Sequence, residues 1–125
     1  MSEETVTIEN IGGNNIRVHS MGVSEEFYGV NHIVADFGDG TDRLIVDRDV
    51  AAGILVYGGE GDDYLSYLGN GTAYIYGGEG NDSLYAGYGT SYVYGEAGND
   101  TLYGTDGPSL LYGGSENDTI LGGNN

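Results

Sequence analysis

The sequence predicts an all-β solenoid in which the chain winds through two sheets, with 18 residues in each coil. Three observations predict this fold. A glycine-rich nonapeptide recurs without interruption over residues 68–121, its eighth position is aliphatic in every copy, and copies with an acidic sixth residue alternate with copies that lack one. Fixed-period repeats of this kind are typical of proteins whose units pack only on their neighbours.

Each nonapeptide divides into a six-residue turn and a three-residue strand. The copy at 77–85 reads GGEGNDSLY, and the copy at 95–103 reads GEAGNDTLY. Glycine permits the turn because it adopts backbone angles that other residues avoid. Neighbouring residues of a strand point to opposite faces, so the eighth position is expected to face the core. These expected core residues are Leu65, Ile75, Leu84, Val93, Leu102, Leu111 and Ile120.

The acidic sixth positions predict a column of carboxylates along one side of the solenoid. Two nonapeptides complete one coil, and each coil advances by about 4.8 Å, the spacing of neighbouring strands. The opposite side has small uncharged residues, where a change of Ser91 is expected to matter little. Asparagines that precede three of the acids (Asn81, Asn99 and Asn117) suit left-handed turn geometry. The acids are Asp63, Asp82, Asp100 and Asp118, spaced 19, 18 and 18 residues apart.

The repeat continues upstream in a less regular form. The stretch DFGDGTDRLIV (36–46) is a degenerate copy with Asp42 in the acidic position, 21 residues before Asp63. Residues 1–35 contain alternating strand-like segments separated by the turn signal IGGNN. We therefore expect irregular β coils or a cap over residues 1–35, a solenoid over residues 36–125, and no helix.

The charge of the chain excludes several partners and requires a cation. Twenty Asp and Glu residues stand against three Arg and no Lys, which gives a formal net charge of −17. Such a chain repels nucleic acids and anionic lipid, and no apolar run is long enough for membrane insertion. Cysteine is absent, so neither a disulfide framework nor a thiolate metal site is expected.

The turn pattern G-G-x-G-x-D-x-U-x, in which U is aliphatic, suits Ca²⁺. A glycine-rich turn can aim several backbone carbonyls at one point, and the Asp adds an anionic oxygen. Calcium takes six to eight hard oxygen ligands in flexible geometry, whereas Mg²⁺ demands a tighter octahedron and keeps its waters. Two stacked turns could enclose each ion.

These motifs resemble the RTX family, the glycine-rich nonapeptide repeats of proteins exported by bacterial type I systems. The resemblance implies a right-handed parallel β-roll with Ca²⁺ between successive turns of the same side. It implies three or four ions, here mainly on one side, since only that side has Asp. Glu96 and Glu116 depart from the pattern because each replaces a glycine. The implied ligands are Asp63, Asp82, Asp100, Asp118 and Asp42, with carbonyls of turn residues such as Gly59, Gly61, Gly78, Gly80 and Gly98.

Tyrosines at the ninth position predict ladders on the outer faces of the two sheets. Stacking of these rings within the protein is the favoured interpretation, and contact with a glycan is the alternative. The ladders are Tyr57, Tyr76, Tyr94 and Tyr112 on one sheet, and Tyr85 and Tyr103 on the other.

The predicted function is that of an extracellular calcium-binding structural protein and not of an enzyme. No Ser/His/Asp arrangement or zinc signature is found in the sequence, and the acids repeat instead of forming one site. The expected unpaired edges, TIL (119–121) and part of TVTIE (5–9), predict end-to-end self-association into filaments or a surface layer. The alternative is an RTX module of a larger type I-secreted toxin, enzyme or adhesin. Both imply a secreted or cell-surface location by a type I-like route, because MSEETVTIEN lacks the features of a secretory signal.

Overall fold

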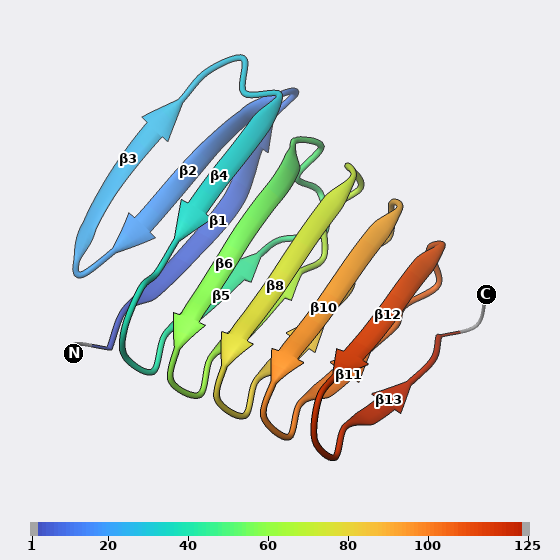
Figure 1. Cartoon of the computed structure of the whole chain (residues 1–125). Coiled ribbons are helices and arrows are strands. Elements are labelled where there is room, and N and C mark those ends of the chain that lie inside the picture. The colour runs from blue at the N-terminus through green and yellow to red at the C-terminus, as the bar shows by residue number, and fades with distance from the viewer. Residues whose placement is uncertain (1–2, 124–125) are drawn as a thin grey trace.

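The computed structural model describes residues 3–123, which form two facing β-sheets with no helix (Figure 1). Accordingly, no helix in this part of the chain is long and apolar enough to cross a membrane. The five-stranded sheet contains β4 (His32–Asp36), β6 (Gly53–Glu60), β8 (Ala73–Glu79), β10 (Ser91–Ala97) and β12 (Ser109–Gly114). The eight-stranded sheet contains β1 (Thr5–Gly12), β2 (Asn15–Ser20), β3 (Val23–Phe27), β5 (Arg43–Val46), β7 (Tyr64–Tyr67), β9 (Ser83–Tyr85), β11 (Thr101–Tyr103) and β13 (Thr119–Leu121).

From β4 to β13 the chain alternates between the sheets and forms a parallel solenoid, as the repeat predicts. Equivalent positions of successive coils pair directly, for example Leu84 with Leu102 and Leu102 with Ile120. Three-residue strands are confirmed for β9, β11 and β13. The same expectation is wrong for the five-stranded sheet, where β8 and β10 each have seven residues. These strands are longer because their pairing continues through the first turn residues, such as Glu60 with Glu79.

The core lies between the sheets, and each sheet contributes a row of aliphatic side chains to it. Leu44, Leu65, Leu84 and Leu102 come from the eight-stranded sheet, and Val56, Ile75 and Val93 come from the five-stranded sheet. Five of the expected core residues, from Leu65 to Leu102, are fully buried, and Leu111 is partly buried against them. Burial of each such side chain contributes about 1.5–3 kcal/mol. The prediction is wrong for Ile120, which is 47% exposed because no coil covers the last strand in the described chain.

Neutral hydroxyl groups close the turns on the side without Asp. Tyr67, which interrupts the nine-residue period, is buried; its hydroxyl donates to Ala52 O (2.7 Å) and accepts from Gly71 N (2.9 Å). One coil later the buried Ser91 Oγ accepts from Gly87 N (2.9 Å). The expectation that Ser91 matters little therefore conflicts with the structure, because its loss would leave a buried N–H without a partner.

An antiparallel meander precedes the coils. β1 pairs with β2 on one side and, in parallel, with β5 on the other, and β2 pairs with β3. Buried Ile8 and Ile16 extend the core into this meander. The prediction that TVTIE forms an unpaired edge is therefore wrong, since β3 and β4 are the edge strands at this end. The division at residue 35 stays a prediction, and β4 crosses it.

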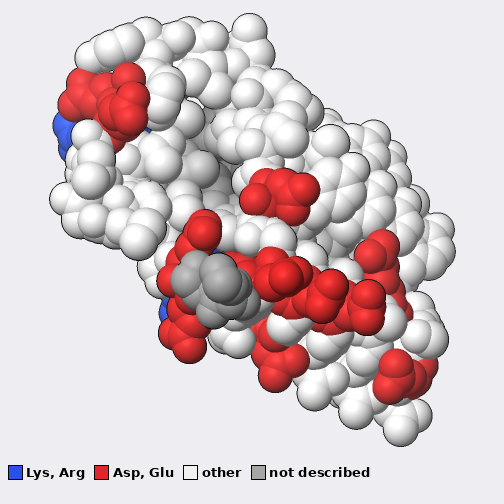
Figure 2. All heavy atoms as spheres, turned by 60° about the vertical axis from the view of Figure 1, so that its left-hand side comes forward, with Lys and Arg blue, Asp and Glu red and all other residues white. Residues whose placement is uncertain are grey.

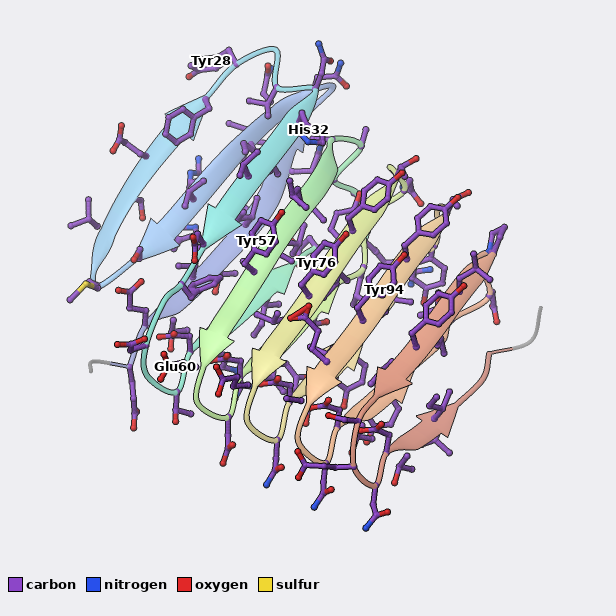
Figure 3. All side chains as sticks on the ribbon, in the orientation of Figure 1. Tyr28, His32, Tyr57, Glu60, Tyr76 and Tyr94 are labelled. Carbon is purple, nitrogen blue, oxygen red and sulfur yellow. The ribbon has the colours of Figure 1, made fainter. Side chains whose placement is uncertain are left out.

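The tyrosine ladders form on the outer faces as predicted. Figure 3 shows Tyr57, Tyr76 and Tyr94 side by side on neighbouring strands of the five-stranded sheet, with ring centroids 4.9–5.1 Å apart. Tyr112 continues this ladder and Tyr85 stacks on Tyr103 in the other sheet. A further pair, Tyr74 and Tyr92, stacks at 4.9 Å and was not predicted. Each cross-strand pair contributes about 0.2–1 kcal/mol.

Candidate metal site

The acidic turns lie at one edge of the solenoid, where the strands of the five-stranded sheet end. Glu60, at the end of β6, marks this edge in Figure 3, and Figure 2 shows acidic side chains in a band along it. The structure brings all five predicted Asp residues into one column. Four of them are at most 2% exposed and Asp118 is partly buried; the four are Asp42, Asp63, Asp82 and Asp100.

Hydrogen bonds between coils fix the orientation of each carboxylate in the column. Asp63 Oδ1 accepts from Asp42 N (2.9 Å), and Asp82 Oδ1 accepts from Asp63 N (2.8 Å). Asp100 and Asp118 repeat this contact one coil at a time. At the start of the column, Asp42 Oδ1 accepts from Glu4 N in the N-terminal segment. The Asp column is thus a continuous ladder that joins five turns.

The second carboxylate oxygen is buried without a hydrogen-bond partner. This holds for Oδ2 of four Asp residues in the described chain: Asp42, Asp63, Asp82 and Asp100. A Cβ placed on Gly58 would lie 2.7 Å from Asp63 Oδ2 and 2.6 Å from Gly77 O. A Cβ on Gly77 would meet Asp82 Oδ2 at 2.5 Å and Gly95 O at 2.9 Å. Only glycine leaves this space, lined by oxygen atoms, open.

Burial makes the charged form of these carboxyls unfavourable. Desolvation raises the pKa of Asp63 and of Asp82 to about 7, against the lowering effect of the backbone N–H that each accepts. Desolvation also raises the pKa of Asp100, and the charge of Asp118 adds to the rise. A buried carboxylate with no partner needs either a proton or a cation.

The arginines of the chain are engaged elsewhere. Arg17 forms ion pairs with Glu9 and Glu26 in the N-terminal meander. The guanidinium of Arg43 lies 4.5 Å from the centre of the Tyr64 ring, and that of Arg48 lies over Tyr88. Within residues 3–123, no ion pair therefore involves the Asp column. A neutralising cation must come from solution.

The five predicted glycine ligands all lie in the acidic turns and have φ between 92° and 115° (Gly59, Gly61, Gly78, Gly80 and Gly98). The turns stack so closely that a Cβ on Gly61 would lie 2.2 Å from Gly40 O. The first-position glycines, whose carbonyl oxygens lie beside the spaces that the orphaned carboxylate oxygens border, were missed as candidates: Gly77, Gly95 and Gly113. The first glycine of the motif G-G-x-G-x-D-x-U-x could have identified them in the sequence.

Side chains alone do not complete a metal site. Within residues 3–123, no three His, Asp or Glu side chains converge as a metal cluster. The donor set of each turn is instead one carboxylate oxygen beside backbone carbonyl oxygens. Hard oxygen donors of this kind suit Ca²⁺ and do not suit softer metals.

Glu96 and Glu116 occupy glycine positions and keep the glycine-like backbone. Their φ angles are 79° and 76°, in a region that side chains other than glycine rarely adopt. Such residues cost about 1–3 kcal/mol each. The two turns nearest the C-terminal end of the solenoid are therefore the strained ones.

The asparagines before the acids have a role that the sequence interpretation missed. None of them has a positive φ, so the expected left-handed geometry is wrong. Asp62 Oδ1 accepts from Asn81 N (2.8 Å), and Asn81 Oδ1 accepts from Asn99 N (2.8 Å). Asn99 Oδ1 accepts from Asn117 N in the same way. This Asn ladder runs beside the Asp column with the opposite direction of donation.

A hydrogen-bonded chain of Ser24, His19 and Glu9 crosses the outer face of the meander. Ser24 Oγ lies 2.6 Å from His19 Nδ1, and His19 Nε2 contacts Glu9. The sequence interpretation found no such arrangement, since antiparallel pairing creates it across strands. These three side chains lie on an open, partly exposed surface of the meander.

This fold and this column define a class: a parallel β-solenoid whose stacked glycine-rich turns each hold one buried carboxylate among backbone oxygens. The family model described as "RTX calcium-binding nonapeptide repeat (4 copies)" matches residues 55–69, 67–102 and 94–125. These segments cover more than half of the chain, and the chain belongs to this family. Neither the curated proteins nor the solved structures compared with the chain gave a match.

The site residues fit the ion for which this family is described. The four orphaned Oδ2 atoms and the glycine-lined spaces beside them offer unshared oxygen donors in a repeating arrangement. RTX repeats bind Ca²⁺ and form structural or binding modules, and the solenoid described above is such a module.

Proposed function

We propose that the chain is an extracellular structural protein whose solenoid is folded and stabilised by Ca²⁺. The observation that carries this proposal is the set of four buried Oδ2 atoms without partners. Folding buries these carboxylates at a cost that a core of one or two aliphatic side chains per strand does not readily offset. An ion that binds only the folded form contributes its binding free energy to folding.

We assign the ligands to the Asp column and to the carbonyls of the same turns. Asp63, Asp82 and Asp100 lie inside the column, and Asp42 and Asp118 lie at its ends. When bound, Ca²⁺ would supply positive charge to the orphaned oxygens. Five stacked turns leave four intervals, consistent with three or four ions.

The proposed location of the protein follows from the calcium concentration that its folding requires. Extracellular calcium modules bind at around 10⁻⁴–10⁻³ M, far above the working range of cytosolic calcium sensors. The chain is then loosely folded before export and ordered outside the cell. RTX repeats occur in proteins secreted by type I systems, which supports a secreted or cell-surface location by that route.

Self-association of the solenoid through its ends, into filaments or a surface layer, belongs to this proposal. Within residues 3–123, β12 and β13 each have one edge without a partner strand, which supports it. The acidic surface in Figure 2 argues against nucleic acid as a partner. A glycan could contact Tyr76 and Tyr94 only through ring edges and hydroxyls, because both faces of each ring stack on neighbouring rings.

A second candidate function is that of an RTX module within a larger secreted toxin, enzyme or adhesin. The same open edges favour it, since further coils could continue both sheets beyond β12 and β13. In that case the solenoid would serve folding and export, and other domains would carry the activity.

A calcium titration followed by circular dichroism tests the principal proposal. We expect β structure to increase with Ca²⁺ and to disappear when a chelator is added. Mg²⁺ at the same concentration should have little effect. A spectrum of folded β structure that excess chelator leaves unchanged would rule out calcium-driven folding.

A further inference from the structure

A second row of outward side chains crosses the five-stranded sheet beside the longer tyrosine ladder. This row contains Tyr74 on β8 and Tyr92 on β10, whose rings stack with 4.9 Å between centroids and 10° between planes. Leu55 on β6 pairs in register with Tyr74, and Leu110 on β12 pairs in register with Tyr92. The stack is therefore two rings long and has a leucine on each side.

The ring of Tyr92 has one face that stacks on no other ring in the part of the chain that the structure describes. This face is turned towards β12, because Tyr74 on β8 covers the opposite face and β10 lies between β8 and β12 (Figure 1). In the longer ladder, by contrast, Tyr76 and Tyr94 have rings on both faces. An open aromatic face beside a shorter side chain is a place where another ring can stack.

A shallow cavity of about 290 Å³ opens at this face of Tyr92, and we call it the ring slot. It lies where β10 and β12 begin, at the opposite edge of the five-stranded sheet from the Asp column. Its lining residues belong to these two strands or directly precede them, and none carries a charge. They are Thr90, Ser91, Tyr92, Pro108, Ser109 and Leu110.

The lining of the ring slot combines apolar groups with hydroxyls. The ring of Tyr92 and the side chains of Pro108 and Leu110 form its apolar part. Ser109 Oγ donates to a backbone oxygen in its own turn (3.2 Å), which leaves its lone pairs free to accept from a ligand. Thr90 is exposed, so its hydroxyl is accessible as well. A ligand that fits the slot has an apolar ring face and a polar edge.

We propose that the ring slot binds one ring of a neutral sugar in a glycan. A pyranose ring has a face of C–H groups that packs on an aromatic ring and an edge of hydroxyls, so it matches both parts of the lining. A charged ligand does not match, because no lining residue can pair with a cation and the formal charge of −17 repels an anion. An aromatic side chain of a protein would use the Tyr92 face but not the hydroxyls of Thr90 and Ser109.

This inference names a partner class for the proposed function and rests on that function. The slot exists only in the folded solenoid, which is proposed to require Ca²⁺, and the proposed location outside the cell is where the chain would meet a polysaccharide. The slot and the Asp column lie at opposite edges of the sheet, so ligand binding and calcium binding can be measured separately.

NMR spectra of the ¹⁵N-labelled protein in saturating Ca²⁺ test the slot with neutral trisaccharides, namely cellotriose, maltotriose and tri-N-acetylchitotriose. We expect at least one of them to shift the amide signals of Thr90, Tyr92, Ser109 and Leu110. One bound ring corresponds to a dissociation constant of about 1 mM. The amide signals of the Asp column should not move.

Two substitutions should prevent sugar binding by opposite means. Tyr92→Leu removes the aromatic face, and Leu110→Tyr fills the slot with a ring that continues the stack. Each should weaken binding by about tenfold or more. Leu110→Tyr should also keep or raise the urea midpoint of unfolding, because it adds a stacked pair.

Leu55→Tyr is the matched control, since it makes the same change on the other side of the stack, next to Tyr74. This variant should bind sugar as the wild type does. Circular dichroism of each variant in Ca²⁺ checks that the β structure is retained. Equal loss of binding in Leu55→Tyr and Leu110→Tyr would contradict the assignment of the slot.

Indole, added as an aromatic probe, distinguishes the other occupant. Shifts of the slot amides with indole and with none of the sugars would overturn the proposal in favour of an aromatic side chain of a protein partner. A protein that folds with Ca²⁺ but shows no shift of these amides with any of the sugars refutes the sugar site alone. A chain that does not respond to Ca²⁺ refutes the proposed function.

Discussion

Two substitutions of Asp82 distinguish the roles of the two oxygens of its carboxylate. Asp82→Asn keeps an Oδ1 that can accept from Asp63 N but removes the charge of Oδ2. Asp82→Ala removes both. In Ca²⁺ both variants should need a higher calcium concentration to fold. Asp82→Ala should lose about a further 1–3 kcal/mol, because it also leaves a buried N–H without an acceptor.

The magnitude of the charge effect follows from the burial of Asp82. The rise of its pKa from 3.8 to about 7 corresponds to about 4 kcal/mol for the ionised form, and solvent screening at a site this close to the surface reduces it to roughly 2 kcal/mol. Calcium has to offset this cost. In chelator at pH 8, where the cation is absent, Asp82→Asn should therefore be folded to a greater extent than the wild type.

Urea unfolding at saturating Ca²⁺ and calcium titrations, both followed by circular dichroism, measure these differences. Asp62→Asn is the control, since it removes the same charge one residue away at an exposed position and also keeps its Oδ1 acceptor. Its calcium midpoint should stay close to that of the wild type. Equal midpoints for Asp82→Asn and the wild type would refute the assignment of Oδ2 as a calcium ligand.

Three other predictions concern protons, hydroxyls and strain. In chelator, β structure should increase as the pH falls through about 7 and be complete near pH 4. The reason is that burial raises the folded-state pKa of Asp63 and Asp82 above the unfolded value, so the folded form binds protons more tightly. A pH series of circular dichroism spectra checks this prediction. A loss of β structure as the pH falls over this range would contradict it. Ser91→Ala should lower the free energy of unfolding by about 1–3 kcal/mol in Ca²⁺, because Gly87 N loses its buried acceptor, as urea unfolding would show. Glu96→Gly should raise the unfolding midpoint by relieving about 1 kcal/mol of backbone strain at φ 79°, and a lower midpoint would mean that the Glu96 side chain stabilises its turn.

The periodic part of the fold could be predicted from sequence because it is local. The spacing of glycines, of aliphatic residues such as Leu84, and of Asp82 and its equivalents is enough to give the coil, the core and the column. The strand lengths of the five-stranded sheet could not be predicted this way, since pairing through Gly59 and Gly78 depends on the neighbouring coil.

What the sequence could not show are contacts made across coils or across strands. The Asn ladder joins residues 18 or 19 positions apart, and the sequence alone favoured left-handed turn geometry for Asn81 and Asn99. Tyr67 looked like an irregularity in the period, but it fills the interior below a turn. The antiparallel path of β2 and β3 lies outside the repeat altogether.

The opposed directions of the two ladders determine where the solenoid comes apart. Each interior acidic turn is held to both neighbours by side-chain hydrogen bonds, because Asp82 accepts from the coil before it and Asn81 from the coil after it. Within residues 3–123, the turn of Asn117 and Asp118 is held from one side only. The molecule should therefore open by peeling from that end, one coil and one ion interval at a time, and amide protection should increase steadily from β13 towards β7. Removal of calcium would therefore first shorten the ordered part of the solenoid and only later unfold all of it.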